Sequence, residues 1–352
     1  MQQPGLFGIK YSNRDFTVES GWSKNNFNSA FPASLACYMH SANISPVYMK
    51  IDVKGALIHS QISVLELFGI NPLSDDLFFS FESDFIPYQQ FVVGNVPRID
   101  LVTLQRSSSL SLRGLEIKLT ALPDNSTHHL TEEQYGCEIV VRPDTIVYLA
   151  LSIALAFKDK LDELKALLQA NPLNIINWSD GEEILPFIPN MAAALNHIMN
   201  NNAHLQQPLI MQPIWKTDGK KPILYQNAFD IFVWSNFAFT KLFFYVAEER
   251  LSRISRQARS IIWLMKMLLD YAQDGKINHT QIIDELSHAT RNDKAFSVPG
   301  RITHRFMTSE ELTCPRIKKE ELKNIVLGGG QNLLSPERRL DAVILRTPGI
   351  FD

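Results

Sequence analysis

Cysteine is scarce in this sequence and widely spaced. Only three cysteines occur in 352 residues, at positions 37, 137 and 314, and no two of them form a CxxC pair. Zinc sites and disulfide frameworks both need cysteines at shorter, recurring spacings, so neither is expected. A sequence of this kind is typical of a reducing compartment, and we expect the protein in the cytoplasm.

The sequence also lacks a hydrophobic run long enough to cross a membrane. Its longest apolar stretch, residues 146–157, has about 12 residues where a bilayer needs roughly 20. Met1–Lys10 has no apolar core of the kind found in signal peptides. We therefore expect no membrane partner and interpret the apolar stretch as a buried helix.

Neither sign of charge is in large excess, but charge is unevenly distributed. Residues 1–150 carry 10 Lys and Arg against 15 Asp and Glu, whereas residues 151–352 carry 24 against 22. In the second part four arginines recur every three residues, which keeps them on roughly one side of a helix. They are Arg250, Arg253, Arg256 and Arg259. This arginine stripe is either a solvated helix face or a surface that contacts nucleic-acid phosphates.

The chain contains enough apolar material for a globular core, because 45% of its residues are apolar and 21 are phenylalanine. Disorder is therefore excluded as the dominant state. The length allows two domains, or one large domain with insertions.

Local patterns predict strands in the first half and helices afterwards. Residues 1–46 look irregular apart from a short helix at 33–40, and 56–68 fits a helix or a strand. The expected strands are residues 47–53, 77–85, 92–104, 112–119 and 137–141. A long helix is expected over Thr145–Gln169 with Asp144 as its N-cap. Further helices are expected over residues 190–200, 228–246, 249–271 and 280–290. These elements predict an α/β fold, with a mixed sheet flanked by helices and a mostly helical C-terminal half.

Two acids and a lysine on neighbouring expected strands form the candidate for chemistry. Glu116 and Lys118 are two residues apart, so on a strand their side chains point to the same face. A hairpin through Ser107–Ser109 would bring Asp100 beside Glu116. Two adjacent carboxylates repel each other, and a divalent cation relieves that repulsion. Oxygen ligands suit Mg²⁺, and a nearby lysine can position or help deprotonate the attacking water. The pattern therefore predicts metal-assisted hydrolysis of phosphodiesters.

The acid-x-Lys triplet alone is common in this sequence. The secondary structure expected around each triplet decides which one is a candidate for the active site. It also occurs at residues 52–54, 163–165, 218–220, 274–276 and 321–323. Only Glu116 has a strand of its own, an acid on the preceding strand and a helix shortly afterwards. The alternative interpretation is an exposed strand edge with one salt bridge, which contributes about 0–1 kcal/mol.

The sequence around these residues resembles a known family. The similar segments are Arg98–Asp100, Gly114–Asp124, Asn13–Phe16, Trp22–Tyr38, Glu138–Ile146 and Gln212–Lys220. They resemble type II restriction endonucleases of the HindVP family, which belongs to the PD-(D/E)xK nuclease superfamily. The sequence departs from the nominal superfamily motif because Ile99 precedes Asp100 and Pro97 lies three residues ahead of it.

The resemblance implies a PD-(D/E)xK restriction-endonuclease-like core. In it Asp100 and Glu116 would bind Mg²⁺, for which Mn²⁺ can substitute, with the backbone carbonyl of Ile117 as a third ligand. Lys118 would orient the water that attacks. The implied substrate is double-stranded DNA, cut to leave 5′-phosphates at a site like GRCGYC. A cognate DNA methyltransferase would accompany the enzyme, and a near-palindromic site would require a homodimer.

The resemblance also divides the chain by role. Residues 1–46 would contribute to the core or to a DNA clamp, and residues 47–170 would form the catalytic core. Residues 171–352 would serve DNA recognition and dimerisation, with one continuous domain as the alternative.

Several further residues are candidates for the site, and each also has an ordinary structural interpretation. Glu19 could approach the metal from an N-terminal helix, and Glu138 could supplement the site or merely cap its strand. Arg142 could contact the scissile phosphate or pair with Asp144. Three lysines suit either phosphate contacts or a solvated turn; they are Lys216, Lys220 and Lys221.

Two other functions stay open from the sequence. One is a repair or recombination nuclease that recognises DNA structure. The other is a DNA-binding regulator without catalysis, in which the helix expected over residues 280–290 reads DNA.

Overall fold

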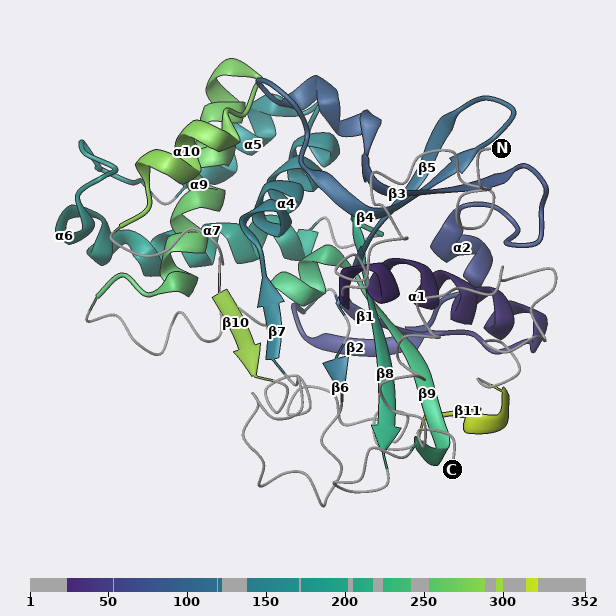
Figure 1. Ribbon diagram of the computed structural model, residues 1–352. Coiled ribbons are helices and arrows are strands. Elements are labelled where there is room, and N and C mark those ends of the chain that lie inside the picture. Colours follow the sequence, from purple (N-terminus) through teal and green to yellow (C-terminus); the bar gives the residue numbers. More distant parts are fainter. Residues whose placement is uncertain are drawn as a thin grey trace.

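The computed structural model describes ten stretches of the chain, namely residues 24–52, 54–118, 120–121, 138–170, 172–201, 205–217, 224–241, 253–288, 296–299 and 315–321. Its helices are α1 Lys24–Ser41, α2 Val64–Phe68, η3 Ile86–Phe91, α4 Pro143–Ala156, α5 Leu161–Gln169, α6 Gly181–Ile184, η4 Leu185–Phe187, α7 Ile188–Asn201, α9 Arg256–Asp274 and α10 His279–Glu285. Its strands are β1 Val47–Ile51, β2 Leu57–Gln61, β3 Leu77–Asp84, β4 Arg98–Gln105, β5 Leu110–Ile117, β6 Thr120–Ala121, β7 Glu138–Val141, β8 Leu209–Thr217, β9 Leu224–Trp234, β10 Phe296–Pro299 and β11 Ile317–Lys318. Figure 1 shows how these elements are arranged.

Most strands belong to one mixed sheet, which confirms the expected α/β class. Among the described residues nine strands join it, and its main path runs β2-β1-β9-β8-β5-β4-β3. Along this path β1 pairs with β9 and β5 with β8 in parallel, and the other neighbours are antiparallel. β6 continues the pairing with β8, while β7 and β10 form a separate antiparallel pair.

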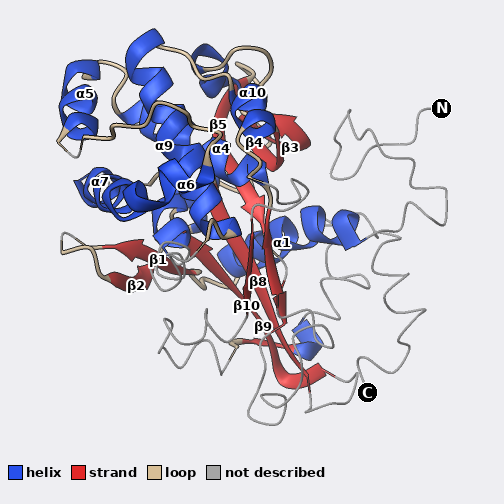
Figure 2. Ribbon diagram, turned by 90° about the vertical axis from the view of Figure 1, so that its left-hand side faces the viewer, coloured by secondary structure: helices blue, strands red, loops and turns tan. Residues whose placement is uncertain are grey.

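Two groups of helices cover the sheet. One apolar cluster contains residues from α4, α5, α7 and α9, and a second contains residues from α1 and α2. Figure 1 shows α4, α7, α9 and α10 gathered on one side of the long strands, with α1 and α2 on the other. In the turned view of Figure 2, β8 and β9 run down from the larger group. The sheet is therefore buried on both faces near its centre, and its central strands read as continuous apolar runs.

The hairpin that carries Asp100 and Glu116 is confirmed. β4 and β5 pair in antiparallel register from Leu101 opposite Leu115 to Gln105 opposite Leu110. The turn between them is the serine-rich segment, and Ser109 adopts a left-handed conformation with φ of 56°. This hairpin fixes the position of the candidate site on two adjacent strands.

One helix expected in the mostly helical C-terminal half is wrong. The helix expected over residues 228–246 is instead the end of β9 followed by a helical segment at residues 236–241. The cause is burial on both faces. Ala228 to Trp234 are all buried, so the segment has no alternation of apolar and polar residues by which to recognise a strand. β8 and β9 lie in the same sheet as β5, so the sheet crosses the boundary expected at residue 170.

The long helix expected over Thr145–Gln169 is two helices. α4 ends at Ala156 and α5 begins at Leu161. α4 is buried over nearly its whole length, and the break falls in the exposed charged run Lys158–Lys160, which favours water over the core. The N-cap of α4 is Arg142 with Pro143 in the first turn, so Asp144 lies inside the helix and the predicted cap is wrong. No described helix has the length and apolar character that crossing a membrane requires.

Candidate active site

Asp100, Glu116 and Lys118 come together where β4 and β5 meet. The register that pairs Leu101 with Leu115 places Asp100 opposite Glu116 when it is continued by one residue. The backbone N–H of Ile117 donates a hydrogen bond to Asp100 Oδ2 at 2.7 Å. Lys118 Nζ forms an ion pair with Glu116 Oε1. The three side chains therefore occupy one small region of the sheet, as the sequence pattern predicts.

Burial gives this cluster unusual electrostatics. The side chains of Lys118 and Glu116 are only 10% and 14% exposed. Desolvation and the neighbouring charge of Glu116 raise the pKa of Asp100 from 3.8 to about 8. Burial opposes the charge of Lys118, but Glu116 and Asp100 more than offset it, so the pKa of Lys118 lies above its ordinary value of 10.5. At neutral pH the lysine is charged, and without another cation Asp100 tends to hold a proton.

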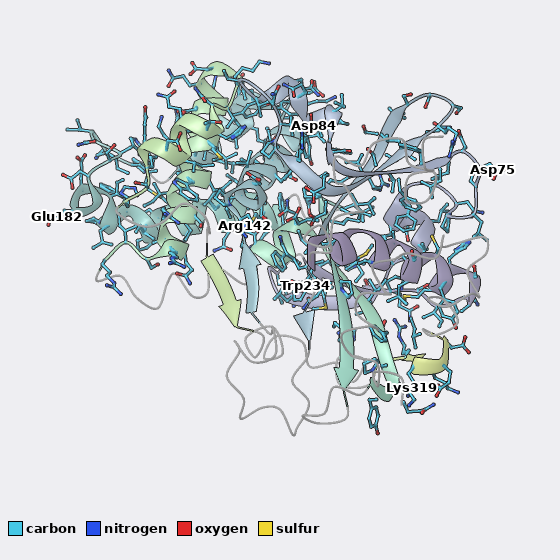
Figure 3. All side chains as sticks on the ribbon, viewed as in Figure 1. Asp75, Asp84, Arg142, Glu182, Trp234 and Lys319 are labelled. Carbon is cyan, nitrogen blue, oxygen red and sulfur yellow. The ribbon has the colours of Figure 1, made fainter. Side chains whose placement is uncertain are left out.

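The start of α4 brings further side chains near the cluster; Arg142 was a candidate from the sequence, whereas Asp144 and Tyr148 were not predicted to lie there. Burial and the charge of Glu116 raise the pKa of Asp144, which shows that this carboxyl lies near the cluster. One turn later, the hydroxyl of buried Tyr148 donates to the carbonyl of Pro97, just ahead of β4. Arg142 caps this helix and is exposed; Figure 3 shows it where β7 meets α4. Sequence alone gives no sign of these contacts, because α4 follows β7 and not the hairpin.

Glu82 is a further acid beside the cluster. On β3, Phe81 pairs with Leu101 and Ser83 pairs with Ile99, so Glu82 falls level with Asp100. Its φ of 49° is in the left-handed region, which is uncommon for glutamate and recurs at functional sites. The acidic side chains in and beside the cluster thus come from three neighbouring strands, β3, β4 and β5.

The donor set suits a hard divalent cation with few protein ligands. Among the described residues no three His, Cys, Asp or Glu side chains converge to enclose a metal. Mg²⁺, however, commonly uses one or two carboxylates and completes its shell with water and phosphate oxygens. Burial and the neighbouring charge of Glu116 raise the pKa of Asp100, and a cation between the two carboxylates would offset both effects. Asp100 and Glu116 therefore fit such an ion.

The raised pKa of Asp100 predicts how pH changes the stability of the metal-free protein. The folded state binds the Asp100 proton more tightly than the unfolded state does, so this contribution is complete below about pH 4. It is lost as the pH rises towards about 8. With EDTA present, Asp100→Asn should therefore flatten the fall of the unfolding temperature between these values.

Thermal unfolding measured from pH 4 to 8 checks this prediction. Asp75→Asn, at an exposed turn, is the matched control and should keep the wild-type slope. Parallel curves for Asp100→Asn and wild type would contradict the prediction.

Several other residues predicted for the site cannot be placed as side chains. Glu19, Lys220, Lys221 and Arg250 lie outside the described residues. Glu138 begins β7 and Lys216 lies in β8, but their side chains are outside the described part of the structure. Their roles stay predictions.

The arginine stripe is not a single surface. Arg253 and Arg256 are exposed, at or just before the start of α9. Arg259 is instead fully buried, where its guanidinium lies 4.4 Å from the ring centroid of Trp263. It also donates to the carbonyl of Ser287 at 3.3 Å. The expectation that Arg259 contacts DNA is thereby corrected: steps of three residues drift around a helix, so the series leaves the exposed face at Arg256 and reaches the buried face at Arg259.

Arg259 and Arg256 should respond differently to substitution. Arg259→Met should lower the free energy of unfolding by roughly 2–4 kcal/mol, because it removes a buried cation–π contact and a charged hydrogen bond. Arg256→Ala should change it by less than about 0.5 kcal/mol. If Arg256 contacts a phosphate, its loss should also lower the salt dependence of DNA binding by about one unit of slope. Denaturant unfolding and DNA titrations at several salt concentrations measure both effects, and equal stabilities of the two variants would contradict the assignment.

The helix that a DNA-binding regulator would use is shorter than expected. α10 ends at Glu285 and buries Ile282 and Ile283. Residues 289–290 of the expected helix lie outside the described residues.

Comparisons with known proteins identify the family of the chain. The family model described as HindVP restriction endonuclease matches residues 22–351. A protein named type II restriction enzyme HgiDI, from Herpetosiphon aurantiacus, is 46% identical over 353 residues, covering 100% of this chain and 98% of that protein. A protein named probable type II restriction enzyme HindVP, from Haemophilus influenzae, is 41% identical over 351 residues, covering 99% and 95%. No solved structure matches the chain.

Proposed function

The chain belongs to the HindVP restriction endonuclease family and is thus a site-specific endonuclease of the type II class, and we propose that it hydrolyses double-stranded DNA with Mg²⁺ at the Asp100–Glu116–Lys118 cluster. The observation that carries the proposal is the buried contact of these residues across the β4–β5 hairpin. Mn²⁺ is proposed as a substitute for Mg²⁺, because both accept oxygen ligands.

In this proposal each residue of the cluster has a separate task. Asp100 and Glu116 would hold the ion, with the carbonyl of Ile117 as a further ligand. When bound, Mg²⁺ would supply positive charge to the phosphate oxygens and would make water more acidic. Lys118 stays charged because its pKa is raised, so it orients the attacking water by donating hydrogen bonds and does not take up the water proton. The ion pair with Glu116 fixes the position of that ammonium group.

The bond changes follow from this arrangement. The oxygen of the oriented water attacks phosphorus in line, and the bond from phosphorus to the 3′ oxygen breaks. The products are a 3′ hydroxyl and a 5′-phosphate. Arg142 is exposed at the start of α4 and its charge acts on Lys118, so we propose that it contacts the phosphodiester that is cut.

The wider context of the reaction is proposed on the family relationship. We propose a near-palindromic recognition site like GRCGYC, read by a homodimer, and a cognate DNA methyltransferase that protects the host DNA. The enzyme would act in the cytoplasm. Residues 47–170 would form the catalytic core, residues 1–46 would contribute to this core or to a DNA clamp, and residues 171–352 would serve recognition and dimerisation, with β8 and β9 of that part also completing the sheet of the core.

Digestion of plasmid DNA by the purified protein tests this function. With Mg²⁺ or Mn²⁺ the expected result is discrete fragments that share one terminal sequence and carry 5′-phosphates, and EDTA should prevent cleavage. Cleavage of flaps or junctions without regard to sequence would instead identify a structure-specific repair nuclease. Tight DNA binding with no cleavage in either metal would identify a non-catalytic regulator and refute the proposal.

A further inference from the structure

The side-chain amide of Gln212 on β8 is buried, and among the described residues only its oxygen has a hydrogen-bond partner. Its side chain is fully buried, and its Oε1 accepts a hydrogen bond from Trp234 Nε1 at 2.8 Å. An indole N–H can only donate, so this bond fixes which end of the amide is oxygen. The amide nitrogen, Nε2, has no hydrogen-bond partner within the part of the chain that the structure describes. Two N–H donors are therefore left buried without an acceptor.

Strand register places this amide beside the catalytic cluster. β5 and β8 pair Glu116 with Ile210 and Ile117 with Met211, and β6 continues in the same register with Thr120 opposite Ile214. The backbone N–H of Lys118 donates to the carbonyl of Met211 at 2.8 Å, which keeps the strands together between these pairs. Lys118 is thus level with Gln212 on the neighbouring strand. Residues level with each other in a parallel pair share a face of the sheet, at a strand spacing of about 4.8 Å.

The hydrogen bond to Trp234 turns the amide oxygen of Gln212 towards β9 and its amide nitrogen towards β5. Trp234 ends β9, on one side of β8, whereas Glu116 and Lys118 lie on β5, on the other side. Figure 3 shows Trp234 near the middle of the molecule. The amide oxygen is held towards β9, so Nε2 remains for the space above β5. Lys118 cannot satisfy it, because an ammonium group only donates.

An unsatisfied buried donor costs about 1–3 kcal/mol, so a protein that keeps one needs a reason. In this site the missing partner must be an acceptor that the described part of the chain does not provide. The proposed substrate brings such an acceptor, because each phosphodiester carries two negatively charged non-bridging oxygens.

We propose that Gln212 is a further catalytic residue, whose Nε2 donates a hydrogen bond to a non-bridging oxygen of the scissile phosphate. The assignment rests on the proposed function, since it needs DNA cleavage at this cluster. A fixed donor in a site with little water stabilises the charge that gathers on phosphate oxygens as the water attacks. The bond to Trp234 holds the amide in place before DNA arrives, so no reorientation is needed during the reaction.

Two substitutions separate this role from simple support of Trp234. Gln212→Met and Trp234→Phe both remove the hydrogen bond between the two residues, but only the first removes the amide nitrogen. Gln212→Met should slow single-turnover cleavage by about 10²-fold or more relative to wild type. It should slow cleavage much more than Trp234→Phe does. DNA affinity in EDTA should change equally in the two variants. Because Trp234→Phe also leaves a cavity at a fully buried side chain, thermal unfolding is measured for both, and cleavage rates are compared at a temperature where both are folded. Equal cleavage rates for the two variants would overturn the assignment.

Gln212→Glu provides a second variant if the first folds poorly. It keeps an oxygen that can accept from Trp234 and replaces the amide nitrogen with a second oxygen. It should fold like the wild type, bind DNA in EDTA, and cleave at least as slowly as Gln212→Met, because an acceptor then faces the phosphate. Rapid cleavage by a folded Gln212→Glu variant would also overturn the assignment.

Sulfur substitution at the scissile phosphate identifies the contacted oxygen. A sulfur atom accepts hydrogen bonds poorly, so in wild type one of the two phosphorothioate diastereomers should be cut slowly in part because the Gln212 contact is lost. That penalty should shrink in Gln212→Met and persist in Trp234→Phe. If both diastereomers keep their full penalties in Gln212→Met, Gln212 does not contact the phosphate. A wild-type protein that cuts no DNA would refute the proposed function itself, whereas a wild type that cuts and a Gln212→Met variant that matches Trp234→Phe would refute only the role of Gln212.

Discussion

Replacing Glu116 or Lys118 with alanine is expected to slow DNA cleavage by roughly 10³-fold or more, because the first change removes a ligand of the proposed metal ion and the second removes the group that orients the attacking water. The rate of plasmid cleavage at fixed Mg²⁺ measures the effect. Glu116→Gln should be as inactive as Glu116→Ala, although it keeps the size of the side chain and an oxygen near Lys118. DNA binding in EDTA should survive in all of these variants, because none of them changes the β4–β5 pairing.

The chain contains its own control for these substitutions. Glu163 and Lys165 have the same spacing, but they lie on α5, with side chains 58% and 41% exposed. Glu163→Ala and Lys165→Ala should therefore cut DNA at the wild-type rate. If Glu116→Ala or Lys118→Ala also cuts at that rate while folded, the active site lies elsewhere.

Replacing Arg316 with methionine is expected to cost about 3–5 kcal/mol of unfolding free energy, because it leaves the charge of Asp230 stranded in the core. Asp230 lies within β9 and is fully buried. Arg316 binds it through two hydrogen bonds of 2.7 Å, from Nε to Oδ2 and from Nη2 to Oδ1. The backbone N–H of Ile231 also donates to Oδ1, at 2.8 Å, but this donor is neutral. Among the contacts that the structure describes, no other positive charge could replace that of Arg316.

The double variant tests the reason for this loss. In Asp230→Leu with Arg316→Met no buried charge remains, so the double variant should be more stable than Arg316→Met alone. Denaturant unfolding of the wild type, both single variants and the double variant gives the coupling between the two sites. Additive losses would show that the two residues stabilise the fold independently.

How far the sequence predicted the molecule depended on how local each feature is. The β4–β5 hairpin was predictable because a serine-rich turn separates two strands, and strand periodicity places Glu116 and Lys118 on one face. β9 was missed because its apolar run is buried on both faces and looks the same as a buried helix. Gln212 was invisible as a site residue, since its neighbours Trp234 and Lys118 come from strands that only the tertiary fold brings beside it.

Helix periodicity had the same limit. Spacing by three predicted that Arg256 and Arg259 share one helix face, but at the start of α9 Arg256 is exposed and Arg259 is buried. The outcome depended on Trp263, which accepts the guanidinium of Arg259 on its ring. Likewise Asp144 reaches the cluster only because α4 packs beside the start of β4, where Tyr148 bonds to Pro97.

The parallel pairing of β5 with β8 also sets when the active site can form during synthesis. The β4–β5 hairpin joins residues close in sequence, so it can fold soon after it leaves the ribosome. The other edge of β5 stays unpaired until β8 has been synthesised, and β8 follows α4, α5 and α7 in the chain. A growing chain that ends before β8 thus contains every charged group of the cluster without the strand that anchors Lys118. We expect such unfinished chains to be inactive, which spares the genome of the cell that makes them until folding is nearly complete.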